Sequence, residues 1–164
     1  MDKLSVERRS ANMRQIRSKD TAPELFLRRL LYRKGYRFRL HRKDLPGKPD
    51  LVFPARRKVI FVHGCFWHLH PGCREGRVPE SRRSYWEPKL ARNRQRDVMA
   101  QASLAEQGWK TLTVWECELA KESGELLSRL IDFLGAPAAR GPKKPIGPKG
   151  QGRGDPRLIR RRAR

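Results

Sequence analysis

Residues 59–73 read Val-Ile-Phe-Val-His-Gly-Cys-Phe-Trp-His-Leu-His-Pro-Gly-Cys, and this stretch decides how the rest of the chain is interpreted. The apolar run at its start predicts a β-strand, which ends at His63. Three of the four histidines and two of the three cysteines lie within the stretch, beside Phe66 and Trp67. We therefore expect a strand that leads into a loop rich in metal-binding side chains.

The elements around this strand predict an α/β (α+β) fold. Short β-rich runs lie at 36–40, 51–53 and 111–115. Helices are expected over 5–19, from Thr21 to Gly35 with Glu24 completing a capping box, over 81–107 with a kink or break at Pro88, and over 118–134. This order of elements predicts a mixed sheet flanked by helices.

The charge of the chain indicates a polyanionic partner. The 164 residues carry a formal net charge of +22, from 39 Lys and Arg against 17 Asp and Glu. Nucleic acid is the first candidate, and an anionic membrane surface is the alternative. A membrane partner that requires a spanning segment is excluded, because no apolar run is long enough to cross a bilayer. The first ten residues lack a secretory signal.

The composition changes at Gly135, and we expect two regions. Residues 1–134 form one predicted domain, and 135–164 form a basic tail rich in Gly and Pro that is expected to be disordered. The tail carries +9, which leaves +13 on the domain. The tail either adds non-specific DNA affinity or keeps the chain soluble.

The cysteines and one histidine predict a structural metal site. An odd number of cysteines argues against a closed set of disulfides and favours a reducing cytosol. Cys65, His70 and Cys73 are closely spaced, and Cys117 follows the expected strand at 111–115. Together they would give a tetrahedral Zn²⁺ site with no open position. The alternative is that these are free buried thiols beside an exposed histidine.

A carboxylate begins the strand at 51–53. Asp50 follows Pro49, and the next strand ends at Val62 and His63. This layout is the ground plan of metal-dependent nucleases of the PD-(D/E)xK type, in which Asp50 would hold Mg²⁺ together with the backbone carbonyl of Val62. The second acid and the lysine usual in that plan are absent here. A plain Pro-Asp turn is the alternative.

Several motifs together closely resemble the very short patch repair endonuclease (Vsr) family, from about Ser10 to Leu134. They are NMR (12–14), DTAPE (20–24), LPGKPD (45–50), FVHGCFWH (61–68), YWxxK (85–89), Asn93 and VWEC (114–117). The resemblance implies a restriction-endonuclease-like fold. It also implies an enzyme that recognises a T:G mismatch, left by deamination of 5-methylcytosine, and nicks the strand 5′ to the mismatched thymine.

The resemblance also implies a role for each residue of the site. Asp50 and the Val62 carbonyl would hold Mg²⁺, and His68 would activate or orient the attacking water. His63 would lie beside the leaving oxygen, and Glu24 would be an outer-shell acid; a plain helix cap is the alternative for Glu24. The structural Zn²⁺ ligands would be Cys65, His70, Cys73 and Cys117.

The resemblance gives the aromatic and basic side chains a role on DNA. Phe66, Trp67 and Trp86 would wedge between base pairs, whereas in an ordinary globular protein they would be core. Met13 would wedge from the opposite groove. Three further residues would contact DNA: Arg14 through phosphate, and Lys89 and Asn93 from one face of the helix at 81–107. The alternative for Lys89 and Asn93 is a solvated helix face.

Three hypotheses follow from the sequence. The first is a mismatch-nicking enzyme, the second is a zinc-braced DNA-binding module without catalysis, and the third is a related nuclease with another DNA target. The first implies double-stranded DNA as the substrate, and a functional link to a cytosine-5 DNA methyltransferase and to the mismatch-repair protein MutL. A monomer in the bacterial cytoplasm, associated with the nucleoid, is expected.

Overall fold

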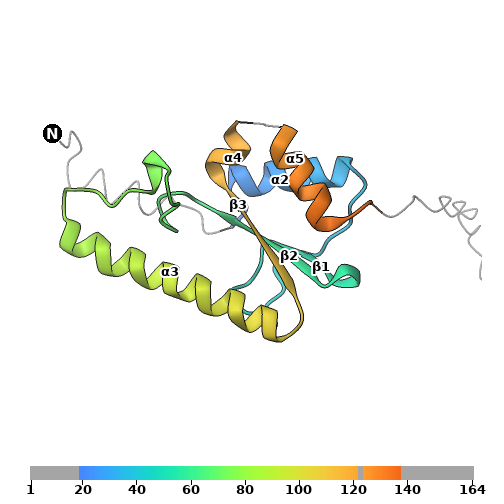
Figure 1. The fold of residues 1–164 in the computed structure, drawn as a ribbon, viewed down its shortest axis with the longest axis horizontal. Coiled ribbons are helices and arrows are strands. Elements are labelled where there is room, and N and C mark those ends of the chain that lie inside the picture. Colours follow the sequence, from blue (N-terminus) through green and yellow to red (C-terminus); the bar gives the residue numbers. More distant parts are fainter. Residues whose placement is uncertain (1–18, 122–123, 138–164) are drawn as a thin grey trace, which may run out of the picture.

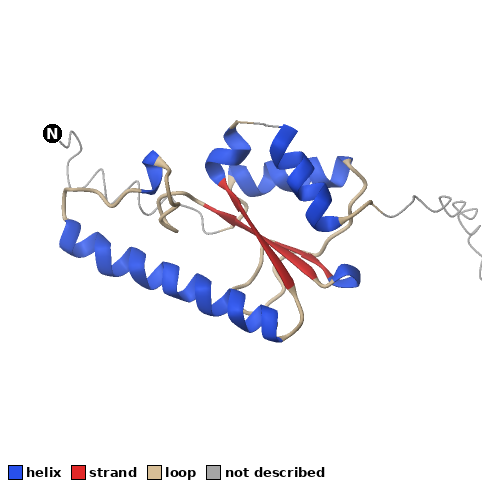
Figure 2. Ribbon diagram, in the orientation of Figure 1, coloured by secondary structure: helices blue, strands red, loops and turns tan. Residues whose placement is uncertain are grey.

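A small mixed sheet lies at the centre of the fold, with helices on both of its faces (Figures 1 and 2). The computed structural model describes residues 19–121 and 124–137. Strands β1 (Leu51–Phe53), β2 (Lys58–His63) and β3 (Lys110–Trp115) lie in the order β1-β2-β3. β1 pairs antiparallel with β2, and β2 pairs parallel with β3. The predicted mixed α+β architecture is thus confirmed in its coarse form.

The helices form two layers. α2 (Ala22–Arg33), α4 (Glu116–Ala120) and α5 (Gly124–Leu134) cover one face of the sheet, and α3 (Arg83–Glu106) crosses the other (Figure 1). A short 3₁₀ turn, η1 (Pro54–Arg56), joins β1 to β2. A second one, η2 (Arg74–Gly76), follows the loop after β2. No helix within residues 19–121 and 124–137 is long and apolar enough to span a membrane.

Alternating residues of the strands serve the two layers, which is why β1 and β2 are apolar almost throughout. Leu51, Phe53 and Ile60 pack with α2, α4 and α5. Val52 and Val59 pack on the opposite face with Leu45, Phe61, Leu104 and Trp109. A buried sheet of this kind fixes the strand register, because a one-residue slip would exchange the two faces. The end of β2, at His63, is therefore held firmly.

The chain before β1 has one ladder contact instead of the strand that alternation predicts over 36–40. Only a bridge between Arg39 and Val52 forms, although Tyr36 is buried as an inward-facing position should be. The strand prediction is wrong in extent, because β1 is only three residues long and offers little edge to pair with.

Two helix predictions also need correction. α3 passes through Pro88 as one helix of 24 residues, where a kink or break was expected. Pro88 lies in the second turn, so the missing N–H removes a single bond near the helix end. The helix expected over 118–134 is two helices, α4 and α5. α2 ends as predicted, with Gly35 in the left-handed region at φ +93°.

The predicted capping box at the start of α2 is not formed. Thr21 is the N-cap, but its hydroxyl donates to Glu24 Oε1 at 2.9 Å and makes no cap bond to the backbone. The Glu24 carboxylate accepts instead from the N–H of Asp20, one residue earlier, at 3.0 Å. The helix 5–19 expected before α2 lies outside the described residues apart from Lys19, as do Met13 and Arg14.

Candidate active site and metal centre

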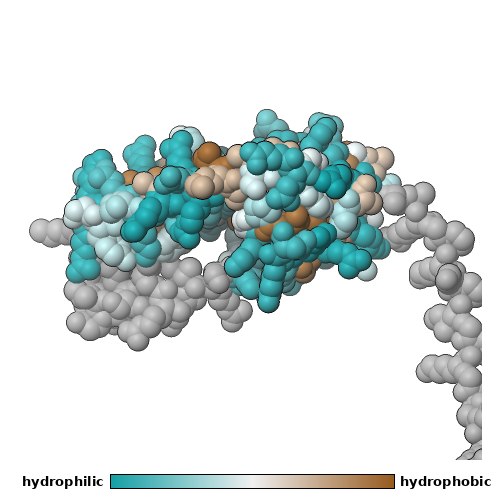
Figure 3. All heavy atoms as spheres, turned by 90° about the horizontal axis from the view of Figure 1, so that it is seen from below, coloured by the Kyte–Doolittle hydropathy of each residue, from teal (hydrophilic) through white to brown (hydrophobic). Residues whose placement is uncertain are grey.

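A cleft of about 530 Å³ opens between the end of β2, the start of α2 and the middle of α3. Acidic and imidazole side chains lie along it, and basic side chains surround them. Its acids are Glu24, Asp50 and Asp97, its histidines are His41, His63 and His68, and its basic residues include Lys19, Lys43, Lys48 and Arg96. A cleft with this mixture of acidic, imidazole and basic side chains suits a polyanion that carries a reactive phosphate. The face of the molecule seen in Figure 3 is mostly hydrophilic over its described atoms.

Asp50 is fixed by the register of the hairpin. Its N–H donates to the carbonyl of Ile60 at 3.1 Å, and its Oδ2 accepts from the N–H of Val62 at 2.7 Å. Burial raises the pKa of Asp50 to about 6, against the Val62 hydrogen bond, which lowers it. The negative charge of Glu24 raises this pKa further, whereas Arg28 and His68 lower it. Ionised Asp50 is therefore destabilised by its burial, and a bound cation would offset this cost.

The backbone of Val62 is oriented toward Asp50. The N–H and C=O of one strand residue point to the same side. Since the Val62 N–H meets Asp50, its carbonyl is directed to that side as well, and β1 has no residue paired with Val62. A carboxylate and a free carbonyl together are the oxygen donors that Mg²⁺ prefers. This donor set fits the predicted magnesium site.

The two histidines predicted for catalysis stack on one another. The ring centroids of His63 and His68 are 3.8 Å apart, with an interplanar angle of 12°. His63 is only 6% exposed. Its burial, together with the positive charge of His68, lowers the pKa of His63 to about 4, although Asp97 opposes the shift. His63 is therefore a neutral imidazole at pH 7.

Asp97, which was not singled out from the sequence, meets His68. The distance from His68 Nδ1 to Asp97 Oδ2 is 2.5 Å. A carboxylate at Nδ1 selects the tautomer with the proton on that nitrogen, which leaves Nε2 as an acceptor. No local motif marks Asp97, because it comes from a charge-rich helix 29 residues further along the chain. His63, His68 and Asp97 also form a group whose ligand atoms lie close enough to bind a metal.

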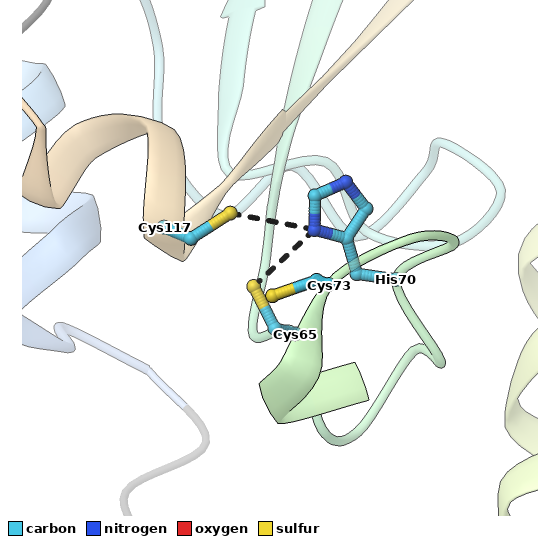
Figure 4. A group of neighbouring side chains, drawn as sticks. All are labelled: Cys65, His70, Cys73 and Cys117. Carbon is cyan, nitrogen blue, oxygen red and sulfur yellow. Dashed lines mark hydrogen bonds between the residues drawn. The ribbon is translucent and has the colours of Figure 1, made fainter. Parts of the chain in front are cut away.

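The four predicted zinc ligands come together (Figure 4). Cys65, His70 and Cys73 lie in the loop after β2, and Cys117 comes from the first turn of α4. Their ligand atoms all lie within 4.8 Å of one another. His70 Nδ1 is 3.5 Å from Cys65 Sγ and 3.4 Å from Cys117 Sγ. A tetrahedral ion with Zn–S of about 2.3 Å and Zn–N of about 2.0 Å would separate these atoms by about 3.5 Å.

The parallel pairing of β2 and β3 brings these ligands to one edge of the sheet. His63 and Trp115 are partners at the ends of the two strands. The ring of Trp115 stacks on His70 with centroids 4.1 Å apart and packs edge-on against His63 at 5.4 Å. In the absence of a cation, burial raises the pKa of the Cys65 thiol to about 12. A bound cation would reverse this preference and hold the thiolates.

The predicted wedge rings form one cluster beside the cleft. Phe66 lies 5.1 Å from both Trp67 and Trp86, measured between ring centroids. Lys89 Nζ lies 5.3–5.6 Å from the centroids of Trp67, Tyr85 and Trp86. Phe66 and Trp67 are half-buried, whereas Trp86 is 9% exposed and belongs to the buried part of the cluster.

Asn93 lies on the same side of α3 as Asp97, one turn earlier. Its amide donates to the carbonyl of Trp67 at 3.3 Å, and its side-chain oxygen accepts from Arg96. Asn93 and Asp97 thus attach α3 to two successive residues of the loop, Trp67 and His68. Asn93, predicted as a DNA contact, also lines the cleft.

Comparison with known proteins identifies the family. The chain is 58% identical over 133 residues to the type II nicking enzyme V.XorIIP of Xanthomonas oryzae pv. oryzae, an alignment that covers 81% of this chain and 96% of the relative. Residues 1–74 match the family model described as DNA mismatch endonuclease Vsr. The chain belongs to the Vsr family of DNA mismatch endonucleases.

Two further relatives support the assignment to the Vsr family. The DNA mismatch endonuclease Vsr of Escherichia coli is 47% identical over 111 residues, which cover 68% of this chain and 70% of the relative. The type II nicking enzyme V.NmeAIP of Neisseria meningitidis serogroup A is 39% identical over 132 residues, 79% of this chain and 94% of the relative. The family resemblance expected from the motifs is confirmed, and the chain is a DNA endonuclease of the Vsr type.

Proposed function

We propose that this protein nicks one DNA strand 5′ to the thymine of a T:G mismatch, by Mg²⁺-dependent hydrolysis of the phosphodiester bond. The observation that carries the proposal is the meeting of Asp50 with the His68–Asp97 pair in one basic cleft. A cation-binding carboxylate and an oriented imidazole are the two groups that metal-assisted hydrolysis of a phosphodiester requires.

The proposed chemistry divides between the two sides of the cleft. Asp50 and the Val62 carbonyl would hold Mg²⁺, which would supply positive charge to the scissile phosphate. His68 Nε2 would accept a proton from the attacking water, while Asp97 holds the ring and stabilises the imidazolium that forms. His63, neutral and stacked on His68, would lie beside the leaving oxygen without adding charge.

Zn²⁺ would have a structural role at Cys65, His70, Cys73 and Cys117. All four positions of a tetrahedral ion are filled by the protein, so no position remains for substrate. The ion would join the loop after β2 to the start of α4 and fix the position of the aromatic residues between its ligands. We extend this proposal to a restriction-endonuclease-like fold, on the basis of the mixed sheet and the position of Asp50.

The aromatic cluster would supply selectivity for a mismatch. Phe66 and Trp67 would insert at the weakened base step, where unstacking costs least. Trp86 and Lys89 would support them, and Asn93 would read or position the bases from α3. Met13 and Arg14 remain predictions for the residues outside the described range.

The proposed setting is the bacterial cytoplasm, at the nucleoid, where the protein would act as a monomer. A cytosine-5 DNA methyltransferase would create the bases whose deamination gives the substrate, and MutL would be the link to general mismatch repair. The domain at 1–134 would carry the activity, and the tail at 135–164 would add DNA affinity without sequence preference.

A nicking assay tests the proposal. An end-labelled duplex carries one T:G mismatch in varied flanking sequence, with matched T:A and C:G duplexes, in Mg²⁺ or in EDTA. We expect a single Mg²⁺-dependent nick 5′ to the mismatched thymine, which Asp50→Ala abolishes. Asp132→Asn, an exposed acid on α5 outside the cleft, should leave it unchanged.

Two outcomes of the assay would replace the proposal. Tight binding to the mismatch without any nick would support a zinc-braced DNA-binding module. Equal cleavage of matched and mismatched duplexes would indicate a nuclease with another target.

A further inference from the structure

Arg28 and Glu24 form a buried ion pair at the start of α2, on the wall of the cleft. Arg28 is 8% exposed and Glu24 is 4% exposed. Arg28 Nη2 donates to Glu24 Oε2 at 2.8 Å, and Nη1 donates to Asp20 Oδ1 at 2.5 Å. Burying a charge is costly unless it is paired and hydrogen-bonded, so the stability of this pair depends on keeping these hydrogen bonds.

The Glu24 carboxylate is almost fully occupied by hydrogen-bond donors. Oε2 accepts from the Asp20 N–H at 3.0 Å and from Arg28, and Oε1 accepts from the Thr21 hydroxyl at 2.9 Å. An ionised carboxylate offers about four acceptor sites. Three are filled by donors from the described residues, which leaves one site on Oε1 without a donor among them.

The free acceptor site on Oε1 can take a water molecule while the other hydrogen bonds of Glu24 stay in place. A shift of the carboxylate toward a cation at Asp50 would break its hydrogen bond to Arg28 and leave that charge unpaired in a buried position. One donor of Arg28 already lacks a hydrogen-bond partner. In the described part of the chain, Arg28 Nε is the one buried side-chain nitrogen or oxygen of which this is true. Glu24 and Arg28 also act electrostatically on Asp50 in opposite directions.

We propose that Arg28 is a positioning residue that anchors the Glu24 carboxylate and so opposes its movement onto the cation bound at Asp50. The inference rests on the proposed function, because it takes Asp50 to be the site of a divalent cation. With Arg28 in place, the cleft would therefore bind a cation more weakly than its acids would without Arg28.

This proposal makes a prediction of unusual sign. Replacing Arg28 with Met removes a positive charge near the cation and frees the Glu24 carboxylate, and both changes favour cation binding. A residue that only supports the fold would lower stability and leave cation affinity unchanged or weaker. The sign of the change therefore separates Arg28 from a residue that only supports the fold, and its dependence on Glu24 separates positioning from the loss of charge.

The test measures Ca²⁺ binding by isothermal titration calorimetry at pH 8, on the full-length, zinc-loaded chain without DNA. We expect Arg28→Met to bind Ca²⁺ about 5- to 10-fold more tightly than the wild type, and the nicking rate at saturating Mg²⁺ to fall about 10-fold. Arg28→Gln, which keeps a donor for Glu24 without the charge, should show a smaller tightening. It also serves if the Met variant does not fold.

Two further variants identify the route of the effect. In a Glu24→Gln background, Arg28→Met should tighten Ca²⁺ binding less than it does in the wild type, because only the loss of positive charge remains. The control is Arg83→Met, because Arg83 makes an i,i+4 pair in the opposite order, with Glu87 on an exposed turn of α3 outside the cleft. It should leave Ca²⁺ affinity unchanged.

The failure of this inference can be told apart from that of the proposed function. Equal or weaker Ca²⁺ binding by both Arg28 variants overturns the role of Arg28 alone. A wild type with no Ca²⁺ binding that depends on Asp50 overturns the proposed function, and this inference with it.

Discussion

Asp97 Oδ2 lies 2.5 Å from His68 Nδ1, and this contact joins the middle of α3 to the loop after β2. Because Asp97 occupies Nδ1, Nε2 is the nitrogen of His68 that is left for chemistry in the cleft. It also means that α3, which is remote in sequence, orients the imidazole that would activate water.

The first prediction concerns Asp97→Asn. The amide can still contact Nδ1, but it no longer enforces the tautomer that leaves Nε2 as a base, nor stabilises the imidazolium. We expect the nicking rate on mismatched DNA to fall roughly 100-fold or more, with DNA affinity nearly unchanged. Single-turnover rates and equilibrium binding would be measured on the same duplex. An unchanged rate would remove Asp97 from the catalytic machinery.

The second prediction is that Asp50→Asn stabilises the metal-free protein. The pKa of Asp50 is about 6 in the fold against 3.8 ordinarily, so the folded state binds more protons between these values. Ionising Asp50 therefore costs stability as the pH rises through this window. At pH 8 the Asn variant should be about 2 kcal/mol more stable to urea.

Two comparisons test the origin of this gain. The difference between wild type and variant should grow from pH 4 to pH 6 and then stay constant, because the opposing titration of His63 is common to both proteins. Mg²⁺ should raise the melting temperature of the wild type and leave that of the variant unchanged. A variant less stable than the wild type at pH 8 contradicts the argument.

The third prediction concerns the pH dependence of nicking. Protonated Asp50 cannot bind a cation, so at low Mg²⁺ the rate should fall as the pH drops through about 6. Because the cation competes with the proton, higher Mg²⁺ should move this acid limb to lower pH. Rates would be recorded over a matrix of pH and Mg²⁺ concentration. An acid limb that stays in place at all Mg²⁺ concentrations would assign it to another group.

The fourth prediction concerns the metal centre. Cys117→Ser should reduce bound zinc from about one ion per chain to near zero and lower the melting temperature by on the order of 10 °C. Zinc would be quantified with a chromophoric chelator after denaturation, and unfolding followed by circular dichroism. Asp132→Asn serves as the control with zinc retained. A Ser variant with full zinc content would show that Cys117 is no ligand.

The fifth prediction concerns the aromatic cluster. Trp67→Ala should weaken binding to mismatched DNA about 10-fold more than binding to matched DNA, because the lost ring would act at the unstacked step. Tyr32→Ala removes a ring that is 58% exposed on α2, outside the cleft, and should leave the ratio unchanged. Fluorescence anisotropy with both duplexes gives the two affinities. An equal loss on both duplexes would make Trp67 part of general DNA binding.

Local patterns predict strands β2 and β3 and the side chains of the Cys/His cluster. The apolar runs that precede His63 and Cys117 are these two strands, and the four side chains come together because the strands are parallel neighbours. Periodicity alone cannot show how much edge a neighbouring strand offers, which is why the strand expected at 36–40 is reduced to the bridge at Arg39.

Contacts between distant charged residues are the part that sequence reasoning misses. Asp97 lies in a helix with many charges, and nothing in its neighbourhood marks it as the partner of His68. Arg28 is a different case, because it lies one turn from Glu24 but the i,i+4 spacing alone does not show that this pair is buried. Packing against Phe66 and Trp67 likewise buries Trp86, for which the family resemblance implies a wedge on DNA.

The nine-residue loop from Cys65 to Cys73 carries two sets of side chains, one in the Cys/His cluster and the other directed to the proposed work on DNA. Side chains of the Cys/His cluster lie at 65, 70 and 73, and the proposed wedge ring and proposed base lie between them at 67 and 68. Inserting or deleting one residue would displace one set relative to the other. Variation among related chains should therefore accumulate here by exchange of side chains at constant length.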